Sequence, residues 1–336
     1  MYQYSYFPSS SDQPIQTLLL DANVTSHMDS IARRGLDFDP PDVHQRIDDL
    51  LERLAADALV MPGMGAAEGV TRRTGFGDVD NYSRRSKNAE AMFADGQQAL
   101  RSWLRGEEFR IPPTATNQGS DERITSLLEI LTDHQVKPSY ALLLHIYELY
   151  REGGSPESSF RRLNTLAEEL FARGSVEMIV GALLLAGTSE AKNMVLDIMK
   201  LREERPPEEV YSALWNASFD LCYSRVAVLP SLPELKGWVD FPCVFVTEDR
   251  HLGNFLELVS PLGGVSLPRG GGVTVNGASF GDRLNAANFE MVKRLVDDST
   301  RRIFCDTTNL EEVSAIRKYR AIKYIQQLER KVASYC

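Results

Sequence analysis

Two short apolar segments, far apart in the chain, have the same pattern: an apolar run that ends at polar or acidic residues. In TLLLDANV, residues 17–24, three leucines lead straight into Asp21, and in PCVFVTEDRHL, residues 242–252, an apolar run stops at Thr247, Glu248 and Asp249. Short apolar runs without a helical period are typical of buried strands in a parallel sheet. Ligands of open α/β folds bind beyond the carboxyl ends of such strands. If the two strands are parallel neighbours, Asp21 and Asp249 lie on one rim.

The residues after the first strand predict helices and a second strand. Residues 25–34 predict one helix, the apolar spacing over residues 41–58 predicts another, and residues 59–61 predict a short strand. In MPGMGAAEGV, Pro62, Gly63 and Gly65 predict a turn, and Glu68 is expected to open the next helix. A further carboxylate is therefore expected near the end of a strand. The residues before position 12 are expected to form a loose lead-in.

The rest of the chain is predicted to be mainly helical. Residues 111–122, rich in Pro, Thr, Asn and Gly, predict a linker. Residues 123–204 predict consecutive amphipathic helices with breaks at Lys137-Pro138, Gly153-Gly154 and Gly174. A helix after Pro207 carries Asp220, and residues 257–277 predict a strand and a glycine-rich hairpin. Residues 285–336 are again helical and end in the basic run IRKYRAIKYIQQLERK.

Composition narrows the class of protein. The chain has 336 residues, of which 43% are hydrophobic and 25% charged, as in an ordinary soluble globular protein. It has no apolar run of membrane-spanning length and no N-terminal signal peptide, so we expect a cytoplasmic protein. A net charge of −10 argues against bulk binding of nucleic acid but not against a local basic patch. The scattered cysteines argue against a zinc site and against a disulfide framework.

Four carboxylates stand at comparable places: Asp21, Glu68, Asp220 and Asp249. Carboxylates near each other repel, and hard divalent cations such as Mg²⁺ and Mn²⁺ prefer oxygen ligands. Such an ion generates a nucleophile from water and stabilises the leaving oxygen of a phosphoryl displacement. The sequence therefore predicts a carboxylate-lined site for Mg²⁺ or Mn²⁺, and it contains no recognisable Ser/His/Asp arrangement. Each acid also has a plainer interpretation, as a helix cap, a first-turn acid or an exposed charge.

This order of elements resembles the PIN-domain family of metal-dependent ribonucleases. The resemblance rests on these residues: Asp21-Ala22-Asn23 after the first strand, Glu68 in MPGMGAAEGV, Asp220 in a helix, and the turn Thr247-Glu248-Asp249. The resemblance implies an α/β fold with a PIN-like three-layer α/β/α sandwich and a parallel sheet. It implies an endoribonuclease that uses Mg²⁺ or Mn²⁺. It covers about residues 15–75 and 207–270, so the sequence between Glu68 and Asp220 must contain a large all-helical insertion.

These considerations divide the chain into four parts. Residues 1–110 are expected to form the first half of the PIN-like domain, and residues 206–280 the second half. Residues 111–205 form the helical insertion, and residues 281–336 a C-terminal helical segment. Asn23, Thr247 and Glu248 are candidate supporting residues that orient the carboxylates, or residues that only stabilise turns. A basic segment after Glu68 is a candidate RNA-binding surface, or a solvated face: Arg72, Arg73, Arg84, Arg85 and Lys87.

The expected function is hydrolysis of RNA phosphodiester bonds, with RNA favoured over DNA as substrate. Two alternatives stay open: a catalytically silent PIN-like scaffold that binds a partner protein through its helical insertion, and a DNA structure-specific nuclease. Both a monomer and an oligomer are compatible with the sequence.

Overall fold

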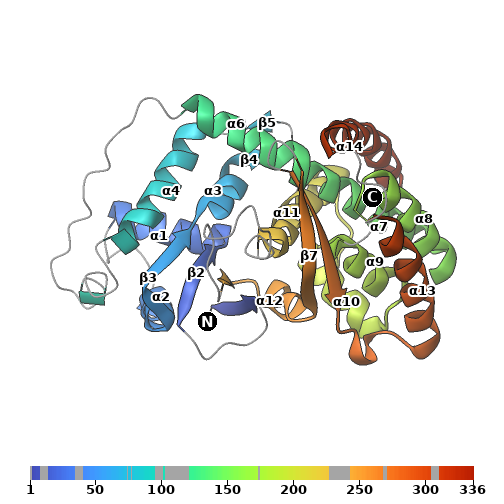
Figure 1. Ribbon diagram of the computed structural model, residues 1–336, viewed down its shortest axis with the longest axis horizontal. Coiled ribbons are helices and arrows are strands. Elements are labelled where there is room, and N and C mark those ends of the chain that lie inside the picture. The colour runs from blue at the N-terminus through green and yellow to red at the C-terminus, as the bar shows by residue number, and fades with distance from the viewer. Residues whose placement is uncertain are drawn as a thin grey trace. The chain divides into compact units, whose positions relative to one another are not determined.

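The chain folds into two compact units. The computed structural model describes residues 2–7, 14–34, 41–73, 75–76, 78–94, 101–102, 121–172, 175–226, 243–267, 271–303 and 310–336 (Figure 1). The first unit combines Met1–Leu128 with Pro233–Gly253, and the second combines Glu129–Leu232 with Asn254–Cys336. Residues 206–280, expected as one half of the PIN-like domain, are divided between the two units. Of the expected linker at residues 111–122, residues 111–120 lie outside the described residues, and the last two begin a helix at Asp121.

A four-stranded sheet forms the centre of the first unit. Its strands are β1 (Gln3–Phe7), β2 (Ile15–Leu20), β3 (Leu54–Met61) and β6 (Cys243–Thr247), in the spatial order β1-β6-β2-β3. Strands β6, β2 and β3 are parallel, and β1 pairs antiparallel with β6. The sheet is therefore mixed, and with the surrounding helices it agrees with the expected α/β class.

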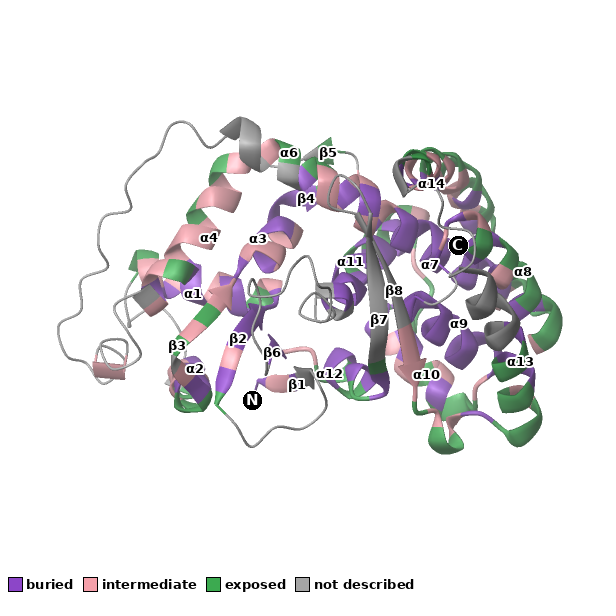
Figure 2. Cartoon of the chain, in the orientation of Figure 1, coloured by how far each residue is buried: buried purple, intermediate pink, exposed green. Residues whose placement is uncertain are grey.

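The apolar run before Asp21 forms the buried centre of this sheet. Leu18, Leu19 and Leu20 are at most 1% exposed although successive side chains point to opposite faces, so β2 is covered on both sides (Figure 2). Val244 and Val246 of β6 join the same apolar core. This burial explains why neither run shows polar alternation.

In the described part of the first unit the sheet is accompanied by α1 (Ala22–Arg34), α2 (Pro41–Arg53), α3 (Gly63–Val70) and α4 (Val79–Ala94). Helix α1 packs against α3 and α4. The core receives Met28 from α1, Ile47 and Leu50 from α2, and Met92 from α4. Two very short strands, β4 (Thr71–Arg72) and β5 (Gly75–Phe76), pair between α3 and α4.

Two sequence predictions about the strands of this unit are wrong. The helix expected over residues 41–58 ends at Arg53, and residues 54–58 belong to β3. Leu54 and Ala58 are four residues apart, which places them on one face of a helix and equally on one face of a strand. The expected loose lead-in contains β1, whose alternation of Tyr4 and Tyr6 with polar residues is a strand pattern.

The second unit is mostly helical, as the sequence predicted. Its elements are α6 (Asp121–Leu131, shared with the first unit), η1 (Thr132–Val136), α7 (Lys137–Glu152), α8 (Pro156–Glu169), α9 (Val176–Ala186), α10 (Ser189–Ile198), α11 (Pro207–Val226), η5 (Gly281–Arg283), α13 (Ala286–Ile303), α14 (Leu310–Val332) and η6 (Ala333–Tyr335). The predicted hairpin is present as the antiparallel strands β7 (Val259–Leu267) and β8 (Gly271–Ala278). A short helix, α12 (Arg250–Leu256), links β6 to β7 and crosses the boundary between the units.

The helix VEMIVGALLLA, α9, is buried within the second unit. Every residue of α9 is buried (Figure 2), as expected for a helix that is hydrophobic all round. Helices α7, α8 and α10 pack against it.

The helix breaks that Gly and Pro residues predicted in this unit agree only in part with the observed ends of the helices. The predicted break at Gly153 is confirmed, because Gly153 ends α7 with a left-handed φ of 75°. The predicted break at Lys137-Pro138 is wrong. The backbone N–H of Lys137 bonds to the carbonyl of Thr132, and this π-helical turn carries the chain past Pro138, which has no N–H to donate. The break predicted at Gly174 lies outside the described residues.

A buried ion pair holds α9 to α11. Glu177 is fully buried and accepts hydrogen bonds from Arg225 and from Ser139 of α7. A second buried cation, Arg317 of α14, lies within electrostatic range of both members of the pair. Burial and the charge of Arg225 lower the pKa of Arg317 to about 9, whereas Glu177 raises it. The Glu177 carboxylate therefore attracts both of these buried cations.

Glu148 makes the second unit sensitive to acid. Its carboxylate lies 2.7 Å from Nδ1 of His145 and accepts a 2.8 Å hydrogen bond from Lys331. Burial alone would raise the pKa of Glu148, but these two partners outweigh it and lower the pKa from 4.5 to about 2. A lowered folded-state pKa adds stability that is complete above the unfolded value and is lost as the pH falls from about 4.5 towards 2.

We therefore expect Glu148→Gln to lower the free energy of unfolding by about 3 kcal/mol at pH 7 and by much less near pH 2. Urea denaturation at both pH values measures the difference. Glu152→Gln, on the exposed part of the same helix, is the control, and a pH-independent loss for Glu148→Gln would contradict the expectation.

Candidate functional site

Asp21 lies where the two predicted strands end side by side. Leu20 of β2 pairs with Val246 of β6 in parallel register, and the backbone N–H of Asp21 donates to the carbonyl of Val246 over 3.1 Å. The expectation that the two strands are parallel neighbours is confirmed. Strand β3 flanks β2 on its other side. The chain therefore continues from β2 to one side of the sheet and later returns to the other side, so the rim at β2 is a topological switch point of the sheet. Open α/β sheets bind ligands at such points.

The Asp21 carboxylate is buried, with an exposure of 3%, and it is held from two directions. Its Oδ2 accepts a hydrogen bond of 2.6 Å from the Thr247 hydroxyl, and its Oδ1 lies 2.7 Å from the backbone N of Ala22. Helix α1 starts immediately after Asp21, with Thr25 donating to the Asp21 carbonyl over 2.8 Å. Thr247 thus contacts Asp21 as a supporting residue would, whereas Asn23 is exposed on α1.

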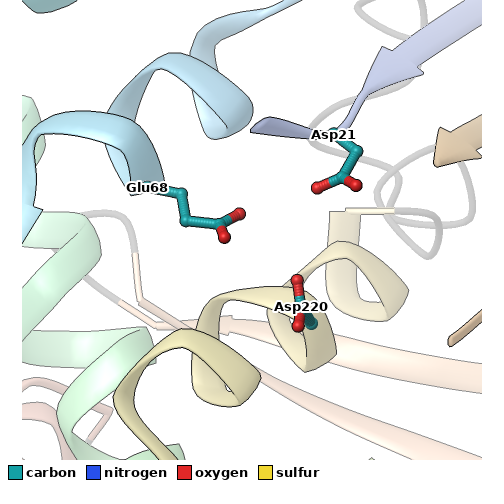
Figure 3. Close-up of side chains that lie close together, drawn as sticks. All are labelled: Asp21, Glu68 and Asp220. Carbon is teal, nitrogen blue, oxygen red and sulfur yellow. The ribbon is translucent and has the colours of Figure 1, made fainter. Parts of the chain in front are cut away.

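Glu68 approaches Asp21 from α3. The expectation that Glu68 opens this helix is wrong, because α3 already begins at Gly63 and Glu68 lies near its end. A carboxylate oxygen of Glu68 lies within 4.8 Å of one of Asp21. Figure 3 shows the two side chains extending towards each other from the end of β2 and from α3. The structure thus brings together two of the expected site residues within the first unit.

Gly65 makes this approach possible, and sequence reasoning missed its role. A Cβ atom at position 65 would lie 2.5 Å from the Thr25 hydroxyl, 2.6 Å from the Leu20 carbonyl oxygen and 2.7 Å from the Asp21 carbonyl carbon. Only glycine lets α3 pass this close to the end of β2. The sequence predicted a turn at Pro62, Gly63 and Gly65, but Gly63 and Gly65 lie within α3, and the small residues of GMGAAEG were the available indication of close packing.

We expect Gly65→Ala to lower the free energy of unfolding by about 1–3 kcal/mol, because backbone atoms must move to accept the methyl group. It should also weaken Mn²⁺ binding, since α3 carries Glu68 away from Asp21. Denaturation and calorimetric titration measure the two effects. The control is Gly69→Ala on the same helix, whose Cβ would meet only the flexible end of Arg85. Equal effects for both variants would contradict this account.

Asp249 and Glu248 make structural contacts at the same rim. The Asp249 Oδ1 accepts hydrogen bonds from the backbone N–H groups of His251 and Leu252 at 2.9 and 3.1 Å, so it caps the start of α12. Its own backbone N–H donates to the Thr247 hydroxyl over 2.9 Å. Glu248 forms an ion pair with Arg46 of α2, and its other oxygen lies 3.7 Å from Nε2 of His27. Neither acid belongs to the carboxylate group that contains Asp21, among the residues that the structure describes.

Asp220 belongs to the second unit. It lies on α11 with an exposure of 6%. It is one of the few buried acids of that unit, so the interpretation as an exposed helix charge is wrong.

The basic segment is only partly a free surface. Arg84 pairs with Asp29 of α1, a carboxylate that is 2% exposed, through contacts of 3.3 and 3.4 Å. Arg85 lies over Gly69 and donates to Ser26 and Asn81 over 3.2 and 3.1 Å, and its burial lowers the pKa of its guanidinium group. Arg84 and Arg85 therefore join α4 to α1. Arg72 is exposed, and Arg73 and Lys87 are half-buried.

The rim has the chemistry of a hard-cation site. Asp21 and Glu68 offer carboxylate oxygens a short distance apart, and their mutual repulsion disappears when a cation lies between them. Magnesium is commonly held by one or two carboxylates and keeps several waters. The hydrogen bonds from Thr247 and Ala22 fix the orientation of one of these ligands.

Comparisons of the chain with protein-family models, with curated proteins and with solved structures gave no match. Among the described residues, no helix is both long enough and apolar enough to cross a membrane. The fold and the site define an α/β unit with an acidic rim, joined in sequence to a helical unit.

Proposed function

We propose that this protein is a PIN-like endoribonuclease that requires Mg²⁺ or Mn²⁺. The observation that carries the proposal is the buried Asp21 carboxylate at the ends of two parallel strands, with a Glu68 oxygen within 4.8 Å. A buried acid held by a threonine hydroxyl and facing a second acid has the form of a metal ligand, and it costs stability unless a cation compensates it.

The arrangement of the first unit supports a PIN-like sandwich. The first parallel strand leads through two helices to the second, β3, and the strand that ends in Thr-Glu-Asp lies on the other side of β2. The resemblance implied this sequence of elements. It also implied that Asp, Glu and the Thr-Glu-Asp turn converge at one end of the sheet.

The residues have different parts in the proposed reaction. Asp21 and Glu68 hold the ion, and Thr247 keeps the Asp21 carboxylate oriented. The resemblance adds Asp220 and Asp249 as ligands, although Asp249 caps α12 and lies outside the carboxylate group of Asp21 among the described residues. Mg²⁺ or Mn²⁺ held there would supply an activated water and a positive charge facing the phosphate. Arg72 and Arg84 are the exposed cations of the expected RNA-binding segment, and Arg84 is paired with Asp29.

The test is cleavage of labelled single-stranded RNA and of single-stranded and flapped DNA in the presence of Mn²⁺, Mg²⁺ or EDTA. Cutting of RNA with either metal and none in EDTA is the expected result. Cutting restricted to flapped DNA would favour the structure-specific DNA nuclease. Failure to cut, together with no Mn²⁺ binding by calorimetry, would favour the scaffold and contradict the proposal.

A further inference from the structure

The C-terminal helix α14 carries a strong local excess of positive charge. It contains six Lys or Arg residues and three Glu residues, in a chain whose net charge is −10. The basic run IRKYRAIKYIQQLERK lies within it and has no part in the site at the acidic rim. A concentration of cations on one element of an acidic protein is typical of a surface that meets a polyanion.

The packing of α14 separates these cations into two groups. One group serves the second unit itself: Arg317 is buried, Lys318 pairs with Asp133 at 2.5 Å, Arg320 donates to the Glu169 carbonyl and Lys331 pairs with Glu148. The other group, Lys323 and Arg330, is exposed to solvent.

The exposed cations share a face with an aromatic ring. Tyr319, Lys323, Gln326 and Arg330 follow one another at intervals of four, three and four residues, which places them along one side of the helix. Tyr319 is 70% exposed, and Ile322 beside it is 36% exposed. Figure 2 shows exposed residues along the outer side of α14. We call Tyr319, Ile322, Lys323, Gln326 and Arg330 the α14 face.

We propose that the α14 face binds single-stranded RNA, with Lys323 and Arg330 on phosphates and Tyr319 stacked on a base. Charge complementarity supports this occupant, because the face presents two cations and a polar amide, and its residues include no acid. An exposed aromatic ring beside cations is the arrangement by which proteins hold single strands without reading their sequence. The choice of RNA rests on the proposed nuclease function. On this inference the helical unit contributes to binding of the RNA substrate.

The test measures binding separately from cleavage. Fluorescence anisotropy of a labelled oligouridine is followed in EDTA, with Asp21→Asn in every protein so that no strand is cut. We expect Lys323→Ala/Arg330→Ala to weaken binding about tenfold and to reduce the slope of log affinity against log salt by about 1.4, the value for two lost phosphate contacts on a single strand. The control, Arg161→Ala/Arg202→Ala, removes the same charge from exposed positions elsewhere in the second unit and should leave the slope unchanged.

Tyr319 gives an independent readout. Tyr319→Ala should weaken binding about tenfold with little change in the salt slope, and Tyr319→Phe should retain the affinity, because stacking needs the ring and not the hydroxyl. All positions are exposed, so the urea midpoints should stay at the parental value.

Three outcomes would overturn the inference: equal changes for the α14 and control pairs, unchanged binding in both Tyr319 variants, or a loss confined to binding of anionic phospholipid vesicles. The last result would assign the face to a membrane surface. Loss of RNA binding in the α14 variants, with no cleavage by the wild type, would contradict the proposed nuclease and leave the inference standing. Normal binding with active cleavage would contradict the inference alone.

Discussion

Asp21→Asn is expected to reduce metal-dependent RNA cleavage by about a thousandfold, because a catalytic ion stabilises the transition state by several kcal/mol and each 1.4 kcal/mol is a factor of ten. The substitution preserves the shape of the side chain, and an amide oxygen still accepts the hydrogen bond from Thr247. The amide nitrogen cannot accept from the Ala22 N–H as the second carboxylate oxygen does, so the loss would combine the missing negative charge with this one hydrogen bond. Initial rates in Mn²⁺ measure it, and calorimetry should show weaker Mn²⁺ binding.

The control is Asp49→Asn, which removes a carboxylate from an exposed position on α2 of the same unit. It should leave cleavage and Mn²⁺ binding at the wild-type level. Asp220→Asn then tests the ligand that the resemblance adds, because a comparable loss would assign Asp220 to the ion. Wild-type cleavage by Asp21→Asn would contradict the proposed site.

Glu177→Leu is expected to lower the free energy of unfolding by about 3–5 kcal/mol, the usual cost of leaving a buried charge without its partner. We expect the loss of unfolding free energy to be about 5 kcal/mol, because Glu177 attracts both Arg225 and Arg317. Arg225→Met removes a cation instead and leaves Glu177 with Arg317, so it should cost less. Urea unfolding of the two variants measures the difference.

The order of the two losses is the discriminating result. If Arg225→Met cost as much as Glu177→Leu or more, Arg317 would not share the carboxylate. Glu157→Leu, on the exposed surface of α8, is the control and should change the unfolding free energy by about 0.5 kcal/mol or less.

The rim could be predicted from sequence because its determinants are local. An uninterrupted apolar run indicates a strand that is buried on both faces. The acid that follows the run lies just beyond the end of the strand, whichever strands are its neighbours in the sheet. That logic placed Asp21 and the Thr247 turn correctly. It also placed the helices of the second unit, although α9 is hydrophobic all round and not amphipathic as the sequence predicted.

Two of the failures depend on partners distant in the chain. Leu54 and Ala58 fit both periods, and pairing with β2 decided for a strand. The Gly65 contact depends on the position of the Leu20 carbonyl. The role of Asp249 is different, because its cap on α12 is a local contact with residues two and three positions later.

The first unit is discontinuous in sequence, and this has a consequence for protein synthesis. The Asp21 carboxylate receives its hydrogen bond from Thr247, 226 residues later. At a rate of about 5–20 residues per second, a ribosome needs about 10–45 s to add that stretch. Until then β2 can pair with β3 but not with β6, and β1 also lacks its partner, which is β6. A nascent chain therefore carries Asp21 without the partner that orients it, so the acidic rim takes its final form only late in translation.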